Sequence, residues 1–168
     1  MKRKVRKNSF WVLLFLVIVL LCMTAPLYAV YSPTEVDLGS VLQRPDAVHW
    51  FGTDRFGRDL FTRVLYGARI SLMVGIVTAV INTIIGVIYG GIAGYVGGRV
   101  DMWMMRLTDI LYSIPELLYI ILIMLIFGSN VRSIIIGVCV AGWISMARMV
   151  RSQIITLKEQ EFALAAFV

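Results

Sequence analysis

The sequence is short of charge, of cysteine and of histidine, and each shortage excludes a class of protein. Only 15% of the 168 residues are charged, whereas about a quarter are charged in a typical soluble domain. His49 is the only histidine, and Cys22 and Cys139 form no C-x-x-C pair. We therefore expect no metal site and interpret the cysteines as small packing residues. The chain also lacks a G-x-x-x-x-G-K-[ST] run and any set of nucleophile, base and acid, so we expect neither nucleotide hydrolysis nor other enzyme chemistry.

Apolar residues, in contrast, make up 60% of the chain and fall in long runs. The four runs cover residues 10–31, 71–96, 102–127 and 131–150. About 20 apolar residues in a helix cross the hydrocarbon core, and a helix pairs every backbone group within itself. The runs do not alternate between apolar and polar residues as barrel strands do. The sequence therefore predicts an all-α membrane protein with four transmembrane helices.

The placement of the positive charges predicts the orientation of these helices. The basic tail over residues 1–9 carries Lys2, Arg3, Lys4, Arg6 and Lys7. Positive residues that flank a span favour the cytoplasmic side, which explains the net charge of +6 without nucleic acid as a partner. The amino terminus is thus predicted to be cytoplasmic, with residues 32–70 and 128–130 periplasmic. The turn over 97–101 and the segment after Met149 then lie in the cytoplasm.

The amino-terminal run allows a second interpretation, a cleavable signal peptide with Leu27-Tyr28-Ala29 as a weak cleavage site. The run is longer than the usual apolar region of such peptides, about 7–15 residues. We therefore expect an uncleaved anchor, and in either case the following loop lies outside the cytoplasm.

The second run contains glycines at every fourth position, namely Gly86, Gly90, Gly94 and Gly98. This spacing places them on one helix face, where small residues let a second helix approach closely. We predict a helix-packing seam there; the alternative is glycine that is merely tolerated in a membrane helix. A weaker version in the fourth run consists of Gly137, Ala141 and Ser145.

The third run carries a polar stripe of Arg106, Asp109, Ser113 and Glu116, whose spacing places them on one helix face. Ionisable groups at the bilayer centre cost ~2.5–3.5 kcal/mol each on insertion scales. One interpretation is that the stripe lines a translocation path in which Glu116 meets a cationic or polar substrate, and Arg106 and Asp109, one turn apart, can pair with each other. The alternative is a structural polar contact between helices.

Pro115 lies directly before Glu116 in the middle of the third run. Proline removes a backbone donor, so we expect a bend there and a free carbonyl near Leu111 or Tyr112.

The outer loop over 32–70 holds the most distinctive segment, HWFGTDRFGRDLFTR, from His49 to Arg63. Gly52-Thr53-Asp54 reads as a turn in which Thr53 or Asp54 caps a following helix. Apolar residues at 56, 60, 61, 64 and 65 predict a short amphipathic helix that lies in the outer membrane interface. Taken alone, a membrane-surface clamp explains Asp54 and Asp59 better than a catalytic role.

Three segments together carry a resemblance to a known family: HWFGTDRFGRDLFTRVLYGARISLMVG, GGRVDMWMMRLTDILYSIPELL and ARMVRSQIITLKEQEFALAA. In this order and spacing they closely resemble the second permease subunit of peptide/nickel ABC importers over nearly the whole chain. The most specific residues are those of the loop motif, Gly52, Thr53, Asp54, Gly57, Arg58 and Asp59.

The resemblance implies a type I ABC importer permease bundle in the bacterial inner membrane, with residues 71–168 as the amino-terminal part of its transmembrane domain. It also implies a sister permease subunit and two cytoplasmic ATPase subunits, which use the ATP, so that this chain needs no cofactor. A periplasmic or lipid-anchored solute-binding protein and the surrounding membrane lipid complete the expected partners.

The carboxyl end resembles the segment that couples such permeases to their ATPases. Thr156 and Glu159 form a T-x-x-E capping box that predicts the start of a cytoplasmic coupling helix within residues 152–168. The residues that match the family's EAA-type signature are Glu161, Phe162, Ala165 and Ala166. The resemblance implies that they dock on an ATPase subunit, although Leu164 and Phe167 depart from the wider family's pattern.

The family's signature glycine and two further spans are expected after Val168, so one alternative is a truncated remnant that does not transport, or a membrane interaction protein. The motifs are shared by peptide and nickel importers. We favour peptides because the spans supply no imidazole and no cluster of thiolate ligands for a metal. An enzyme embedded in the membrane is a third alternative, which the missing catalytic residues disfavour.

Overall fold

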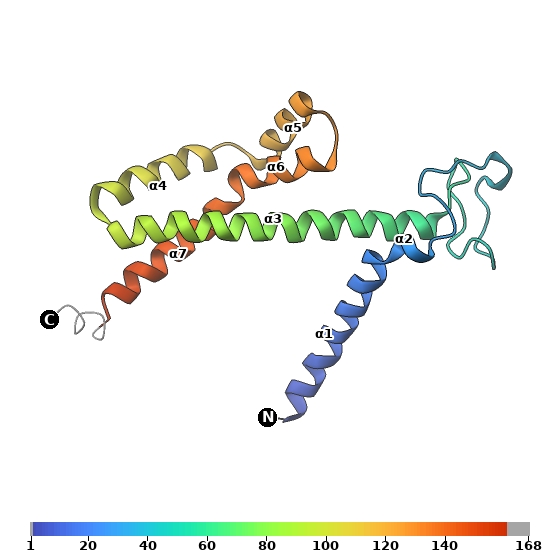
Figure 1. The fold of residues 1–168 in the computed structure, drawn as a ribbon, viewed down its shortest axis with the longest axis horizontal. Coiled ribbons are helices and arrows are strands. Elements are labelled where there is room, and N and C mark those ends of the chain that lie inside the picture. Colours follow the sequence, from blue (N-terminus) through green and yellow to red (C-terminus); the bar gives the residue numbers. More distant parts are fainter. Residues whose placement is uncertain (1, 161–168) are drawn as a thin grey trace. The chain divides into compact units, whose positions relative to one another are not determined.

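The computed structural model describes residues 2–160, and their side chains from Phe10 onward (Figure 1). Its elements are α1 (Lys2–Met23), α2 (Ala25–Tyr28), the 3-10 helix η1 (Leu38–Ser40), α3 (Leu60–Val96), α4 (Gly98–Tyr112), α5 (Glu116–Phe127), α6 (Val131–Ala141) and α7 (Trp143–Lys158). Within this part of the chain, extended pairing is limited to one bridge between Thr53 and Asp59. The predicted all-α class is therefore confirmed. The chain divides into one unit up to Met73 and another from Val74 onward, and each is described by itself.

Large apolar side chains stand exposed along most of these helices, as they do in a protein whose solvent is lipid. In α5, Leu125 is 80% exposed and Ile126 is 70% exposed. Two helical stretches, Leu60–Val96 and Val131–Lys158, are long and apolar enough to cross a membrane, and α4 with α5 would make a third if they form one bent span. The described residues thus contain two or three candidate spans, whereas the sequence predicts four.

The difference arises at the first apolar run, which is predicted as one helix over 10–31. The helix ends at Met23, so its apolar part, Phe10–Met23, is shorter than the other candidates. The Thr24 hydroxyl donates to the Leu20 carbonyl at 2.7 Å, and Pro26 lies in the first turn of α2. A proline is tolerated at a helix start because its missing N–H has no partner there, so the run breaks into two helices.

The second run begins earlier than predicted. The separate interfacial helix expected near residues 56–65 is not present, because the chain from Leu60 to Val96 forms one continuous helix of 37 residues. At 1.5 Å per residue this helix is about 55 Å long, well beyond the hydrocarbon core of about 30 Å. No proline interrupts it, and Gly67 and Gly75 have open space around them, so nothing ends the helix before Val96.

The third run bends at Pro115, as the sequence predicts, but the bend divides it into two helices. The axes of α4 and α5 meet at 74°. Pro115 lacks the N–H that would bond to the carbonyl four residues earlier, that of Leu111. The Tyr119 hydroxyl donates to this carbonyl at 2.9 Å. The carbonyl released by the proline is therefore satisfied from the first turn of the next helix.

The fourth run also consists of two helices, which join at Gly142. The Asn130 side chain accepts from the Ser133 amide at 2.9 Å and caps α6. α7 continues to Lys158, so Thr156 lies inside it and donates to the Ser152 carbonyl at 3.0 Å. Glu159 is the C-cap of α7. The predicted capping box is therefore absent, because Thr156 lies in the last turn of α7 and not before the first turn of a new helix.

Candidate functional site

The loop motif over 52–59 is folded by close backbone approaches at its two glycines. Both have a φ of +72°, a left-handed conformation that favours glycine. A Cβ on Gly52 would overlap the Gln43 carbonyl, and one on Gly57 would overlap the Asp37 carbonyl. The motif glycines therefore allow the segment over 37–43 to lie directly against the turn.

Thr53 fastens the same two segments from its side chain. Its hydroxyl accepts from the Gln43 amide at 2.9 Å and donates to the Ser40 carbonyl, and the residue is 4% exposed. Its backbone amide also donates to the Gln43 carbonyl at 3.1 Å. Thr53 therefore holds the loop together and does not cap the following helix.

Asp54 closes the turn that contains the second half of the motif. Its carboxylate accepts from the Phe56 amide at 2.8 Å and from the Arg58 Nε at 2.8 Å. The Arg58 Nη2 lies 2.7 Å from the same carboxylate, and Arg63 lies further away at 3.6 Å. The Arg58 guanidinium, with the backbone amides, holds the pKa of Asp54 at about 2. Asp54 is therefore ionised at physiological pH and joined to Arg58.

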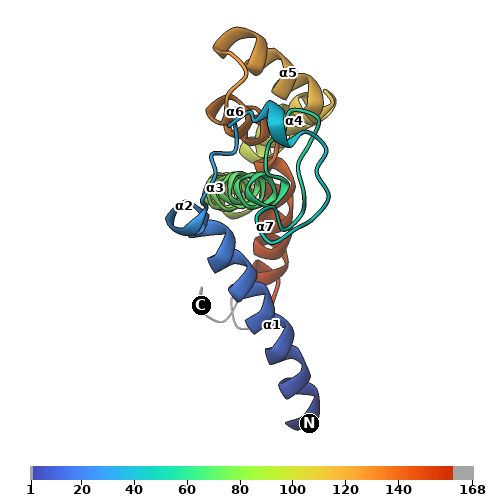
Figure 2. The same cartoon turned by 90° about the vertical axis from the view of Figure 1, so that its right-hand side faces the viewer.

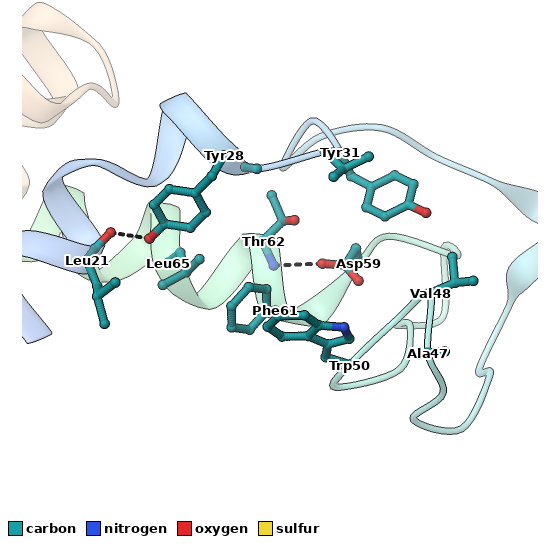
Figure 3. A pocket seen from close by; sticks show the side chains of 12 residues that line it. Leu21, Tyr28, Tyr31, Ala47, Val48, Trp50, Asp59, Phe61, Thr62 and Leu65 are labelled. Carbon is teal, nitrogen blue, oxygen red and sulfur yellow. Dashed lines mark hydrogen bonds between the residues drawn. The ribbon is translucent and has the colours of Figure 1, made fainter.

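Asp59 is the residue that caps α3. Its Oδ2 accepts from the Thr62 amide at 2.7 Å (Figure 3). Its Oδ1 lies 3.0 Å from His49 Nδ1. Burial by itself would raise the pKa of Asp59, but the bonds from the Thr62 amide and from His49 outweigh it and lower the pKa below its usual range. A carboxylate at this position also faces the positive end of the helix dipole. The cap is thus Asp59, where the sequence suggests Thr53 or Asp54.

His49 is the buried partner of Asp59, which sequence reasoning missed. It is 8% exposed and lies between Asp59 and the ring of Tyr31, whose centroid is 5.0 Å away. His49 and Asp59 are ten residues apart in a loop without regular helix or strand, so only the folded loop reveals the pair. Among the residues that the structure describes, no group of three His, Cys, Asp or Glu could hold a metal ion.

In the second unit, the glycines of α3 lie against α7. A Cβ on Gly86 would come within 2.6 Å of Met146 Cβ, and one on Gly94 within 2.9 Å of the Arg151 carbonyl. A Cβ on Gly90 would overlap the Ala147 carbonyl. Figure 2 views α3 nearly end-on, with α7 passing beside it. The small residues therefore permit a contact between the two helix backbones.

Gly98 does not belong to this contact. It is the first residue of α4, has a φ of +57°, and has no atom within 4 Å of its ideal Cβ position. Together with Gly97, whose φ is +70°, it forms the turn between α3 and α4. The four-residue spacing continues into this turn, but the helix does not. In the weaker repeat, a Cβ on Gly137 would lie 2.7 Å from Ile120 Cα, so this glycine packs α6 against α5.

The polar stripe of the third run is exposed and divided by the break at Pro115. Arg106, Asp109 and Ser113 lie on or at the end of α4, whereas Glu116 is in the first turn of α5. All four side chains are exposed. The predicted pair between Arg106 and Asp109 is not formed: Asp109 bonds to Arg148 Nη2 at 2.8 Å. The Arg106 guanidinium instead lies over the Trp103 ring at 5.7 Å.

Two ion pairs connect α4 to α7. Arg148 binds Asp109, and Arg151 binds Asp101 through two hydrogen bonds. The two arginines are three residues apart and share a helix face. The Tyr89 hydroxyl adds a bond from α3 to the Met104 carbonyl of α4 at 2.9 Å. Pairing lowers the cost of placing these charges in an apolar bundle, so both pairs stabilise the contact between α4 and α7.

Asn82 is a polar residue of α3 that no sequence pattern singles out. Its Oδ1 is buried, and no described residue bonds to it. A Cβ on Gly142 would overlap the carboxamide nitrogen of Asn82. The glycine at the junction of α6 and α7 therefore lets Asn82 approach the helix break. Asn82 and Ser145 also line a cavity of about 410 Å³.

Comparison with known proteins identifies the class to which this bundle belongs. Residues 84–168 match the family described as binding-protein-dependent transport system inner membrane component. The chain therefore belongs to this family.

The curated relatives are named as permeases. The chain is 46% identical over 165 residues to the dipeptide transport system permease protein DppC of Bacillus subtilis (strain 168), covering 98% of the chain and 51% of that relative. It is 45% identical over 172 residues to the oligopeptide transport system permease protein OppC of Escherichia coli (strain K12), covering 99% and 57%. For OppC of Salmonella typhimurium (strain LT2) the identity is 48% over 159 residues, covering 94% and 52%. The chain thus spans about half the length of these relatives.

Proposed function

We propose that the chain acts as a membrane-spanning permease subunit of an ATP-driven ABC importer that moves dipeptides or oligopeptides into the cytoplasm. The observation that carries the proposal is the identity of 45–48% to dipeptide and oligopeptide permeases over nearly the whole chain. These relatives are named for peptide transport, which favours peptides over nickel. The exposed apolar helices support a place in the membrane.

In this proposal the chain crosses the bacterial inner membrane four times and has a cytoplasmic amino terminus. The spans are α1 with α2, α3, α4 with α5, and α6 with α7. The positive residues before Phe10 support the orientation. Single cysteines introduced at Ser40 and at Arg99 provide the test: an impermeant thiol reagent added to intact spheroplasts should label Ser40→Cys and spare Arg99→Cys. Labelling of Arg99→Cys alone would reverse the orientation.

The proposed translocation path includes the polar groups of α4 and α5, namely Arg106, Asp109, Ser113 and Glu116. Asp109 is neutralised by Arg148, whereas among the side chains described from Phe10 to residue 160 no ion pair involves Arg106 or Glu116. An uncompensated charge is costly in lipid, so both side chains gain by facing an aqueous path or a partner subunit. Glu116 also lies at the amino end of α5, where the helix dipole favours its negative charge.

The partners follow from the same assignment. A sister permease subunit would complete the bundle, and a periplasmic or lipid-anchored solute-binding protein would deliver the peptide. Two cytoplasmic ATPase subunits would use the ATP, so this chain itself would need no cofactor. Glu161, Phe162, Ala165 and Ala166 lie outside the described residues; we propose that they form the contact with an ATPase subunit, with Phe162 as its apolar anchor.

Uptake by cells tests the proposal. A strain without the gene is complemented with the full chain and its partner subunits, and uptake of a labelled dipeptide, a labelled oligopeptide and labelled nickel is measured. Glu116→Ala should lower peptide uptake by about tenfold, equivalent to roughly 1.4 kcal/mol, at an unchanged membrane level. Glu35→Ala, in the outer loop, is the matched control and should leave uptake unchanged. Loss of nickel uptake alone in the deletion strain would contradict the peptide assignment.

A further inference from the structure

A cavity of about 720 Å³ lies within the first unit, between the end of α1, the segment after α2, the loop before α3 and the first turns of α3 (Figure 3). The residues that the argument uses are Leu21, Tyr28, Val30, Val48, Trp50 and Leu65. Its volume falls in the range of about 300–1,000 Å³ that is typical of small-molecule sites. Neither the loop motif nor the proposed translocation path accounts for it.

The walls of this cavity are mainly apolar, and the polar side chains of Tyr28 and Asp59 in them are already bonded within the protein. The Tyr28 hydroxyl donates to the Leu21 carbonyl (Figure 3). Asp59, the only charged residue among those lining the cavity in the described structure, is occupied by His49 and by the Thr62 amide. A charged or hydrogen-bonding ligand would therefore find few partners. The walls suit a hydrocarbon.

The cavity is continuous with a surface that membrane lipid would cover. Leu21, in its wall, belongs to the apolar helix Phe10–Met23, where Leu13 is 62% exposed and Leu20 is 63% exposed. At the other end of the cavity Val30 is 85% exposed and Trp50 is 64% exposed. Hydrocarbon that surrounds the helix thus reaches the cavity without crossing a polar boundary.

Aromatic residues with a polar edge also surround the cavity. Tyr28, Tyr31 and Trp50 all contribute to its lining. Tyrosine and tryptophan gather where membrane hydrocarbon meets the headgroups, because their rings are apolar and their edges are polar. This composition places the cavity at the outer boundary of the bilayer, at the depth where an acyl chain begins.

We propose that this cavity binds one acyl chain of a membrane phospholipid. The chain end lies beside Leu21 and Leu65, and the headgroup remains outside, near Tyr31 and Trp50. A bound lipid would bridge the end of the first apolar helix, the outer loop and the start of α3, and would hold the loop against the membrane. The proposal requires that the chain sits in a membrane, but it does not depend on which substrate is carried.

The test uses the assembled transporter in nanodiscs of phosphatidylethanolamine and phosphatidylglycerol that contain a small share of phosphatidylcholine with a photoreactive diazirine in one acyl chain. After irradiation, mass spectrometry locates the lipid adducts. Adducts are expected on residues 28–31 and 47–50, in addition to the exposed helix faces. Ala29 lines the cavity, so Ala29→Trp should fill it and lower labelling of 47–50 by about tenfold, equivalent to roughly 1.4 kcal/mol of affinity.

Leu27→Trp is the matched control, because Leu27 is 84% exposed and does not line the cavity. It should leave the labelling of 47–50 unchanged. Val48, in the loop before α3, also lines the cavity, so Val48→Trp replaces Ala29→Trp if that variant fails to reach the membrane. Equal labelling of 47–50 in filled and control variants would overturn the proposal. So would the absence of adducts at both segments in the assembled transporter, which would mean that protein fills the cavity. Peptide uptake is measured on the same variants. Labelling tests the lipid proposal and uptake tests the transport proposal, so the failure of one can be distinguished from the failure of the other.

Discussion

At the scale of single residues, the two aspartates of the loop motif have different structural functions. Asp54 is bound by Arg58 and closes a turn, whereas Asp59 is buried, caps α3 and holds His49. Neither arrangement brings a nucleophile or a metal ligand set into the loop. The motif therefore holds the outer loop against the first turn of α3 through hydrogen bonds and an ion pair.

Removal of the Asp59 cap should weaken the attachment of the outer loop to the first turn of α3. Asp59→Ala leaves the Thr62 amide without its acceptor and His49 without its buried partner. We expect a loss of roughly 1–3 kcal/mol in the free energy of unfolding of the loop, measured as faster proteolysis of residues 32–59 in the purified protein. Asp59→Asn should keep most of the stability, because an amide oxygen still accepts from Thr62. Equal proteolysis of Asp59→Ala and the unchanged protein would rule out the cap.

The loop should also lose stability in acid. A carboxyl group whose pKa is lower in the folded than in the unfolded state stabilises the fold above its ordinary pKa of about 3.9, and this contribution disappears as the pH falls through the folded pKa. For Asp54, whose folded pKa is about 2, the window extends from about pH 4 down to about pH 2. Pepsin cleavage within 52–59, corrected for the enzyme's own pH dependence with an unfolded peptide, should accelerate across this window.

Asp54→Asn supplies the control for the acid prediction. An amide cannot ionise, so the variant should be cleaved faster than the unchanged protein at pH 4 and should show a smaller further change towards pH 2. Cleavage that accelerates equally in both proteins would show that other groups govern the acid response.

At the scale of helices, backbone contacts and helix breaks determine how the second unit packs. Gly86, Gly90 and Gly94 bring α3 against α7, and the pairs Asp109–Arg148 and Asp101–Arg151 connect α4 to α7. Trp143, Ile144 and Ala147 are buried at this contact, with Tyr89 packed against them. The packing of the second unit therefore depends on α7, which contacts both α3 and α4.

The contact between α3 and α7 should be sensitive to a single methyl group. Gly90→Ala places its Cβ against the Ala147 carbonyl, which is backbone and cannot move aside. We expect a loss of about 1–3 kcal/mol in the free energy of unfolding in mixed micelles. Gly75→Ala is the matched control within the same helix, because nothing lies within 4 Å of its ideal Cβ position. It should be neutral or stabilising by up to about 1 kcal/mol. Similar effects of the two substitutions would show that the helices do not touch at Gly90.

The break at Pro115 should depend on the Tyr119 hydroxyl. Tyr119→Phe leaves the Leu111 carbonyl without the bond that replaces its missing helical partner. We expect a cost of about 0.5–1.5 kcal/mol in unfolding free energy. Tyr112→Phe, a matched control on the same bend, should cost less, because its exposed ring keeps its contact with Arg148. A larger effect of Tyr112→Phe than of Tyr119→Phe would contradict this assignment.

Features that depend on a local stretch of sequence can be predicted here, whereas contacts between distant residues cannot. Apolar runs and Pro115 are local signals, so the helical class and the bend can be predicted. The partners of Asp109 and Asp59 lie 39 and 10 residues away, one in another helix and one across an irregular loop, so no pattern within a single element links them. For Gly98 the regular spacing predicts too much. The four-residue repeat includes Gly98, but α3 ends at Val96, so Gly98 does not lie on the same helix face as the other three glycines.

At the scale of the whole molecule, the family match and the apolar surface support one account. The match covers residues 84–168, and the curated relatives align with nearly the whole chain. The exposed apolar side chains along α3 and α5 would be unfavourable in water and are suited to lipid. Among the described residues no group of three His, Cys, Asp or Glu could hold a metal ion. The names of the relatives, and no single span, supply the substrate in the proposal.

ATP-driven peptide uptake by the purified transporter tests the central claim most directly. The full chain, its sister permease and the ATPase subunits are reconstituted in vesicles, with the solute-binding protein and a labelled dipeptide on one side and ATP on the other. The account predicts that peptide accumulates on the ATP side and that omission of ATP or of this chain abolishes the accumulation. Peptide accumulation that continues without this chain, or accumulation of labelled nickel in place of peptide, would contradict it.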